Sequence, residues 1–146
     1  MNQSQSKSPG KKTTSKPVVK IEIPYKPRPY QLEVHNSLKR FSVLVCHRRF
    51  GKSVLAINEL IKTAADKPRS LCAFIAPTYR QGKSIAWEYL KQYTAPLMKF
   101  GGGRNETELR IDLFNNSRIQ IFGADNPDSI RGMGFDKVVM DEYAIM

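Results

Sequence analysis

Apolar residues recur along the chain with the spacing of alternating strands and helices. Short apolar runs at 41–46, 71–76 and 137–140 predict buried strands, and the first and last are rich in valine. Apolar positions at helical spacing over 54–65 and from 79 to about 100 predict helices before and after the second strand. This order predicts an α/β fold with a parallel sheet flanked by helices.

Prolines and glycines set several of the remaining boundaries. Pro24–Pro29 predicts an extended entry to the folded part, followed by a short helix from Tyr30 to Arg40. Pro96 is expected to end or kink the long helix. Gly101–Gly103 then predicts a flexible break.

A β-hairpin is predicted in the second half of the chain. Its strands run from Glu108 to Phe114 and from Arg118 to Phe122. Residues 115–117 form the turn, because asparagine tolerates the left-handed backbone conformation. Residues 123–136 are predicted as an irregular loop that leads into the last strand.

Composition excludes several classes of protein. The 146 residues suit one domain or part of a larger one, and no apolar run approaches the roughly 18 residues of a membrane span. The start of the chain has no apolar signal-peptide stretch. Cys46 and Cys72 are the only cysteines, so we expect reduced cytoplasmic thiols and no disulfide scaffold.

The net charge of +11, from 24 basic and 13 acidic residues, favours a polyanionic partner such as nucleic acid. Residues 1–28 contain seven basic residues and one acidic residue, a net +6, which leaves 11 − 6 = +5 for the rest. We expect residues 1–23 to form a disordered basic tail. Such a tail either contacts DNA or is simply solvated, and both interpretations stay open.

The strongest chemical signal is the octapeptide from Cys46 to Ser53. It follows the phosphate-loop pattern G-x-x-x-x-G-K-[ST], except that Cys46 replaces the first glycine. Gly51 would let backbone N–H groups turn toward phosphates, Lys52 would reach the β- and γ-phosphates, and the Ser53 hydroxyl could ligate Mg²⁺. Its place between a predicted strand and a predicted helix favours a nucleotide site over a chance match.

Two adjacent carboxylates, Asp141 and Glu142, follow the last predicted strand. Neighbouring side chains of a strand point to opposite faces, so the two acids would have different tasks. Asp141 could hold Mg²⁺ directly or through water, and Glu142 could polarise an attacking water. A lone Asp-Glu pair is more often a solvated turn, but the upstream phosphate loop favours the nucleotide site.

Tyr30 and Gln31 form a weaker signal at the start of the first predicted helix. A glutamine amide offers one donor and one acceptor side that match the edge of adenine, and the tyrosine ring could stack on the base. Spacing alone favours the alternative of an incidental glutamine in the first turn of a helix.

The motifs together resemble the N-terminal ATPase of the large terminase subunit of tailed bacteriophages, the motor that packages DNA into proheads. They are Tyr30-Gln31, Arg-Arg-Phe-Gly-Lys-Ser at 48–53, Ala-Pro-Thr-Tyr-Arg-Gln at 76–81, Ser-Ile-Arg-Gly at 129–132 and Val-Met-Asp-Glu-Tyr-Ala at 139–144. The resemblance covers residues 24–146, and a replaced first glycine is usual in this family. It implies a P-loop NTPase fold of the ASCE type with a hairpin insertion.

The resemblance implies a role for each matching residue. Gln31 would read adenine, Arg48 would sense the γ-phosphate, and Glu142 would be the catalytic carboxylate. Ser53 and Asp141 would hold Mg²⁺. The residues that would contact ATP are Tyr30, Gln31, Arg48, Arg49, Phe50, Gly51, Lys52 and Ser53.

Arg131 lies in a glycine-flanked loop before the acidic strand. There it could reach the nucleotide of a neighbouring subunit as an arginine finger in trans. The alternative is that Arg131 pairs with Asp125 or Asp128 and orders its own loop. Residues 78–81 follow the second strand, where the resemblance implies coupling between nucleotide state and DNA-facing surfaces.

The resemblance also implies cofactors, partners and missing parts. It implies ATP, Mg²⁺, double-stranded DNA, the portal protein, the small terminase subunit and a homo-oligomeric ring, in the host cytoplasm and transiently at the prohead portal. Further strands would follow Glu142, including one between the phosphate-loop strand and the acidic strand, and then a nuclease domain. We therefore expect an ATPase domain incomplete at its C-terminus, marginally stable alone and weakly active or inactive.

Two other functions stay open. A superfamily 2-like helicase or other DNA translocase shares the adenine-reading glutamine and the Asp-Glu pair, although the continuation Tyr143-Ala144 and the two arginines of the phosphate loop differ from the helicase pattern. A nucleic-acid-binding remnant without turnover would instead show salt-sensitive DNA binding that ATP does not change.

Overall fold

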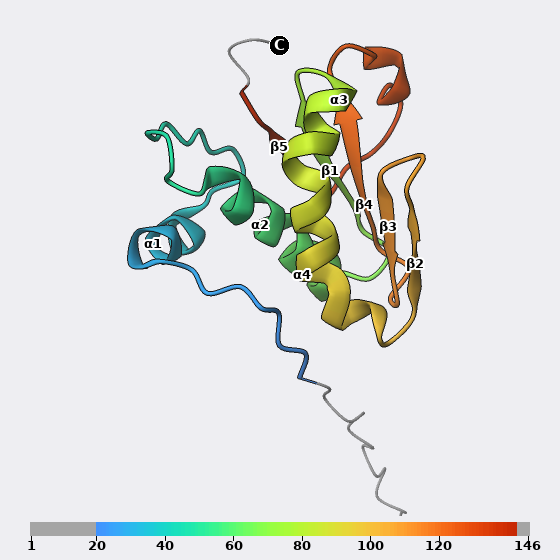
Figure 1. Cartoon of the computed structure of the whole chain (residues 1–146), viewed down its shortest axis with the longest axis horizontal. Coiled ribbons are helices and arrows are strands. Elements are labelled where there is room, and N and C mark those ends of the chain that lie inside the picture. Colours follow the sequence, from blue (N-terminus) through green and yellow to red (C-terminus); the bar gives the residue numbers. More distant parts are fainter. Residues whose placement is uncertain (1–19, 143–146) are drawn as a thin grey trace, which may run out of the picture.

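A five-stranded mixed sheet organises residues 20–142, the part of the chain that this computed structural model describes (Figure 1). The strand order is β2-β3-β4-β1-β5. Central strand β1 pairs in parallel with β4 and β5, whereas β2, β3 and β4 pair antiparallel. The strands are β1 (Leu71–Ala76), β2 (Gly102–Asn105), β3 (Arg110–Leu113), β4 (Arg118–Gly123) and β5 (Lys137–Met140).

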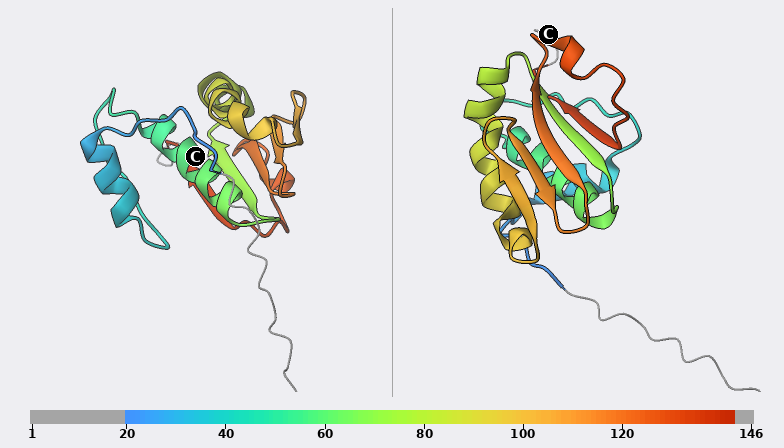
Figure 2. Two further views of the ribbon diagram at one scale, coloured as in Figure 1. Left: turned by 90° about the horizontal axis from the view of Figure 1, so that it is seen from below. Right: turned by 90° about the vertical axis from the view of Figure 1, so that its right-hand side faces the viewer.

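Helices α2 and α4 cover one face of the sheet, and the described part of the chain contains six helical elements in all (Figure 2). They are α1 (Pro29–Ser37), α2 (Lys52–Asp66), α3 (Tyr79–Gly82), the π-helical turn η1 (Lys83–Trp87), α4 (Glu88–Met98) and the 3₁₀ turn η2 (Pro127–Ser129). The helix predicted from residue 79 is therefore formed, and Pro96 lies close to its end. None of the described helices has both the length and the apolarity to cross a bilayer.

The main core lies between the sheet and helices α2 and α4. Leu60 and Ile61 of α2 pack with Phe74 of β1, Ile121 of β4 and Trp87 of η1, and each is at most 1% exposed. Burial of each such side chain stabilises the fold by about 1.5–3 kcal/mol. This core fixes α2 across the sheet, and α2 begins at the predicted phosphate loop.

The loop between β4 and β5 covers part of the opposite face of the sheet. Ile130 and Phe135 of this loop pack on Ile75 of β1 and Phe122 of β4. The rings of Phe122 and Phe135 meet edge to face at 5.8 Å. Strand β1 is thus covered on both faces, which explains why its sequence is one continuous apolar run.

The predicted hairpin is formed by β3 and β4, but the sheet extends one strand further than expected. Gly102 and Gly103 belong to edge strand β2, so the flexible break predicted at Gly101–Gly103 is wrong for these two residues. A Cβ at Gly102 would lie only 2.2 Å from the carbonyl oxygen of Asp112. The glycine is needed because two backbones approach closely here, a reason that sequence periodicity cannot reveal.

The buried strand predicted at 41–46 is not formed. These residues pair with no strand of the described sheet, and Phe41, Val43 and Val45 are 84%, 92% and 92% exposed. Both edges of β1 are occupied by β4 and β5, and the segment between α1 and α2 stands away from the sheet (Figure 1). Valine favours strands because it packs on a pleated, half-buried surface, and no described residue supplies that surface here.

The residues just before Pro24 contact the folded part of the chain. Ile21 and Ile23 are partly buried against the main core. Of the predicted basic tail, residues 1–19 lie outside the described residues, so that prediction stays open for them.

The difference in burial between α2 and the 41–46 segment can be tested by measuring how a substitution in each changes the free energy of unfolding. We expect Leu60→Ala to lower the free energy of unfolding by about 2–5 kcal/mol, since it leaves a cavity in the core. Val43→Ala should change it by less than about 0.5 kcal/mol, because this side chain is already solvated. Chemical denaturation of both variants measures this, and a large cost at Val43 would contradict the observed exposure.

Candidate functional site

The turn before α2 has the backbone geometry of an anion-binding loop. Gly51 is the N-cap residue of α2 and adopts φ 86°, a left-handed conformation that glycine reaches without strain. No side chain caps this end of the helix, and its first turn contains no acidic residue. The free N–H groups and the helix dipole therefore favour an anion beside Lys52.

Asp141 lies next to this turn, although the two motifs are far apart in sequence. Its carboxylate is 3.7 Å from the Lys52 ammonium and accepts a 3.5 Å hydrogen bond from the Ser53 hydroxyl. The backbone N–H of Asp141 donates to Ile75, which continues the pairing of β5 with β1 by one residue. A hydroxyl and a carboxylate at this separation are hard oxygen ligands of the kind that Mg²⁺ prefers.

Glu142 follows Asp141 along the chain. It is exposed and has φ 53°, a left-handed conformation that is uncommon for a residue other than glycine. Backbone strain of this kind is retained where the surrounding structure fixes a residue, and it is frequent at functional sites. The two acids thus have different surroundings, since Asp141 contacts Lys52 and Ser53 whereas Glu142 is exposed.

A cavity of about 480 Å³ joins these elements, a volume within the usual range for small-molecule sites. It is lined by residues 46–54, Ser84, Ile85, Tyr89 and Glu142. Ser84 and Ile85 of η1 and Tyr89 of α4 are lining residues that were not predicted. No motif marks them, because only the crossing of α4 over α2 brings them to the phosphate loop.

Gln31 supports the loop from α1. It is only 4% exposed, and its amide nitrogen donates to the carbonyls of Phe50 and Gly51, both at 3.3 Å. Its amide oxygen accepts from the Arg28 backbone at 2.9 Å. The Tyr30 ring lies 4.7 Å from that of Phe50. In this arrangement the Gln31 amide is hydrogen-bonded to main-chain groups. Recognition of adenine by Gln31 stays a prediction, and it requires hydrogen bonds to the base to replace some of these main-chain hydrogen bonds.

Arg48 and Arg49 add positive charge at the cavity. Both side chains are exposed and line it, and neither forms an ion pair within residues 20–142. Arg49 adopts φ 65°, and its carbonyl accepts a 3.4 Å hydrogen bond from the Arg28 guanidinium. Unpaired guanidinium groups beside a helix N-terminus suit the binding of several phosphate charges.

Arg131 does not line the cavity. Its guanidinium is 3.3 Å from Asp128, and the two side chains are 81% and 75% exposed. Asp125 instead accepts a hydrogen bond from the Tyr79 backbone at 3.2 Å. The loop pairing considered as an alternative role is therefore present with Asp128, although an ion pair this exposed contributes little stability.

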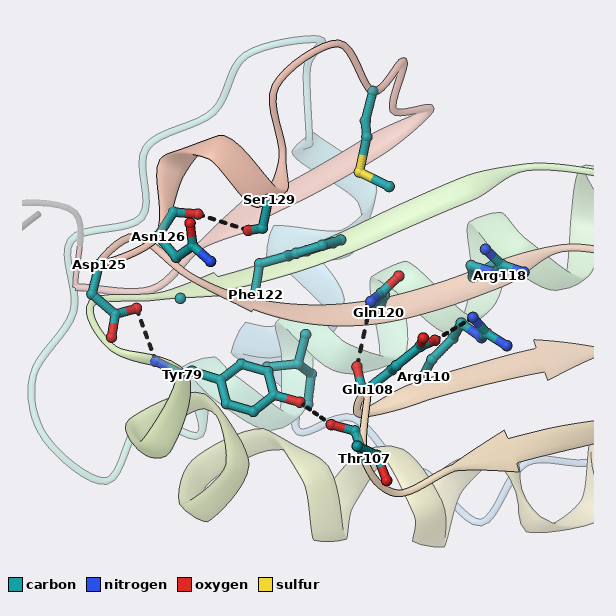
Figure 3. A pocket seen from close by; sticks show the side chains of 13 residues that line it. Tyr79, Thr107, Glu108, Arg110, Arg118, Gln120, Phe122, Asp125, Asn126 and Ser129 are labelled. Atoms are coloured by element: carbon teal, nitrogen blue, oxygen red, sulfur yellow. Dashed lines mark hydrogen bonds and ion pairs between the residues drawn. The ribbon is translucent and has the colours of Figure 1, made fainter.

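A larger cavity of about 680 Å³ lies on the other face of the sheet, between the hairpin and the loop after β4 (Figure 3). Its charged groups bind one another, since Arg110 pairs with Glu108 and Asp112. The Tyr79 hydroxyl donates to the Thr107 carbonyl at 2.7 Å. It has neither the glycine turn nor the unpaired cations of the smaller cavity, which is therefore the candidate site.

Comparisons with known proteins bear on the fold as a whole. No protein-family model matches the chain. The large terminase subunits of Thermus phage G20c and Thermus virus P23-45 are each 27% identical to it over 139 residues. The solved ATPase domain of the Thermus phage P74-26 large terminase superposes with a TM-score of 0.74 at 27% identity, over 84% of this chain. The fold is that of a large terminase ATPase domain.

The similarity to terminases covers only part of those proteins. It spans 84% of this chain but 29% of the two curated terminase subunits and 56% of the solved ATPase domain. A point variant of that domain gives the same result, with a TM-score of 0.72 at 25% identity. The predicted α/β class and the terminase resemblance are thus confirmed.

The conformation of Gly51 gives a test of the terminase-like phosphate loop. We expect Gly51→Ala to lower the free energy of unfolding by about 1–3 kcal/mol, because a side chain at φ 86° is strained. Its Cβ would also lie 2.7 Å from the Gln31 amide nitrogen. The control is Gly134→Ala, where a Cβ meets nothing within 4 Å. Equal denaturation midpoints for the two variants would contradict the left-handed turn.

Proposed function

We propose that this chain binds ATP with Mg²⁺ at the cavity beside α2, as the ATP-hydrolysing part of a phage DNA-packaging motor. The convergence of Lys52, Ser53 and Asp141 is the observation that carries the proposal. Similarity to large terminase subunits supports ATP hydrolysis over simple binding. It also favours a terminase over the helicase alternative.

Each residue of the site has a physical task in this proposal. The backbone N–H groups at the start of α2 and the Lys52 ammonium bind the β- and γ-phosphates, and Arg48 reaches the γ-phosphate. Ser53 and Asp141 hold Mg²⁺, which supplies charge neutralisation on the phosphates. Glu142 orients the attacking water and accepts its proton.

The wider assignments rest on the family and on charge. Double-stranded DNA is the proposed polyanionic partner, supported by the net charge of +11. The portal protein, the small terminase subunit and a homo-oligomeric ring are proposed as the other partners. The proposed place of action is the host cytoplasm and, transiently, the prohead portal.

Nucleotide binding tests the proposal directly. We expect wild-type chain to bind a fluorescent ATP analogue with Mg²⁺, and Lys52→Ala to weaken binding at least tenfold, because it removes the cation nearest the phosphates. Lys62→Ala is the matched control, since Lys62 is an exposed lysine on the same helix. Equilibrium titration measures the dissociation constants, and circular dichroism establishes that all three proteins are folded.

The outcomes separate clearly. Loss of binding in Lys52→Ala alone supports the phosphate loop. Equal binding by all three folded proteins, or no binding by folded wild-type chain, would contradict the ATP site and favour a nucleic-acid-binding role without turnover.

Arg131 is proposed as a finger that acts on the nucleotide of a neighbouring subunit, supported by its strong exposure outside its own cavity. We expect Arg131→Ala to reduce the ATPase rate of an assembled motor by about 10³-fold or more while ATP affinity in the isolated chain is kept. Asp128→Ala is the control, because it removes only the loop pairing. An assembled Arg131→Ala motor with full ATPase activity would remove the finger from the proposal.

A further inference from the structure

A buried carboxylate behind the phosphate loop joins three elements. Glu59 of α2 is 5% exposed, and its two oxygens bind different partners. One oxygen contacts Nδ1 of His35 on α1, and the other contacts the ammonium of Lys137 at the start of β5. On the far side of the imidazole, the Tyr25 hydroxyl lies 2.9 Å from Nε2 of His35. None of these residues lines the cavity.

Helix α1 contacts α2 at two places. Gln31 and His35 are four residues apart on α1, so they share one face of that helix. Gln31 binds the carbonyls of Phe50 and Gly51 at the start of α2, and His35 binds Glu59 further along it. Eight residues separate Gly51 from Glu59, a rise of about 12 Å.

Strand β5 contacts α2 at the same two places. Lys137 and Asp141 are also four residues apart, and alternation along a strand puts them on one face. Asp141 meets Lys52 and Ser53 at the phosphate end of α2, whereas Lys137 meets Glu59. Glu59 is therefore the shared second anchor of both elements that flank the nucleotide site.

The charge on Glu59 is maintained by its partners. Burial alone would raise its pKa, but the hydrogen bonds from Lys137 and His35 outweigh burial and lower the pKa below its ordinary value. Burial is the main reason that the pKa of Tyr25 rises to about 12, so this hydroxyl keeps its proton. An ionised carboxylate can only accept hydrogen bonds, so Nδ1 of His35 and the Lys137 ammonium are the donors to Glu59.

A buried ion pair is a weak means of stabilising a fold, because desolvation offsets most of the attraction. What a carboxylate adds over an apolar residue is direction, since each oxygen accepts a bond along a defined line. An apolar residue at position 59 could fill the same space but could not hold α1 and β5 in fixed registers against α2.

We propose that Glu59 is a positioning residue of the nucleotide site, which fixes α1 and β5 against α2 and thereby sets the placement of Gly51, Lys52 and Asp141. The expected effect of Glu59 on the affinity for ATP rests on the proposed function above. The expected effect of Glu59 on the position of the phosphate loop does not. The test therefore measures both, on the full chain.

The decisive variants are Glu59→Gln and, as control, Glu33→Gln. Both remove one carboxylate charge, but Glu33 is exposed on α1 and forms no ion pair within the described part of the chain. Amide hydrogen exchange without nucleotide is the first readout. We expect exchange in residues 29–37, and at Leu55, whose N–H donates to the Gly51 carbonyl, to become about tenfold faster in Glu59→Gln. It should be unchanged in the control, and unchanged over α4 in both variants.

Affinity for ATP is the second readout. We expect Glu59→Gln to weaken Mg²⁺-dependent binding about tenfold at a temperature where circular dichroism shows it fully folded. Lys137→Met should lose the Mg²⁺-dependent part of the affinity while residues 29–37 keep their slow exchange, because only the β5 anchor is removed. His35→Phe should instead keep the Mg²⁺-dependent part of the affinity while exchange in residues 29–37 becomes faster, because only the α1 anchor is removed.

Two results would overturn the proposal. One is unchanged exchange at 29–37 and at Leu55 in Glu59→Gln. The other is an acceleration that extends equally to α4, which would indicate a general loss of stability. Failure of the proposed ATP site is distinguishable, since it appears as equal binding by wild-type chain and Lys52→Ala. The exchange result then still decides the role of Glu59.

Discussion

The contact between the end of β5 and the first turn of α2 is the constraint on which the site depends. A helix N-terminus attracts anions and a carboxylate attracts cations, so the two together suit the proposed ligand, a phosphate group with its magnesium ion. Their separation of 3.7 Å at Lys52 and Asp141 is set by the packing of α2 against β1 and β5. Leu60, Ile61 and Phe74 have no chemical role, yet they determine whether the site exists.

Prediction from the sequence worked best for motifs whose residues lie close together along the chain. The glycine, lysine and serine of the phosphate loop and the Asp-Glu pair could be identified because each residue type has a specific task at a specific offset. The structure places Asp141 beside Lys52 and Ser53, while the tasks of these residues stay predictions. Helix positions were also predictable, since an amphipathic face records which side of a helix is buried.

The predictions from sequence that were wrong or missing have a common cause. In each case the local structure depends on a contact with residues far away in the sequence. The valine run at 41–46 has the composition of a strand, but a strand needs a neighbour, and β4 and β5 already occupy both edges of β1. Strand β2 was missed because glycine is used there for close backbone approach. Glu59 and His35 were missed because no periodicity shows that a carboxylate on one helix faces an imidazole on another.

The uncovered run at 41–46 has a consequence for the behaviour of this chain in solution. An apolar, uncharged stretch of high β-propensity with open backbone groups is the kind of segment through which protein molecules aggregate. Here it is bracketed by Lys39 and Arg40 on one side and by Arg48 and Arg49 on the other. Like charges at both ends oppose the in-register stacking of identical copies, so the arginines beside the phosphate loop also act as gatekeepers against self-association.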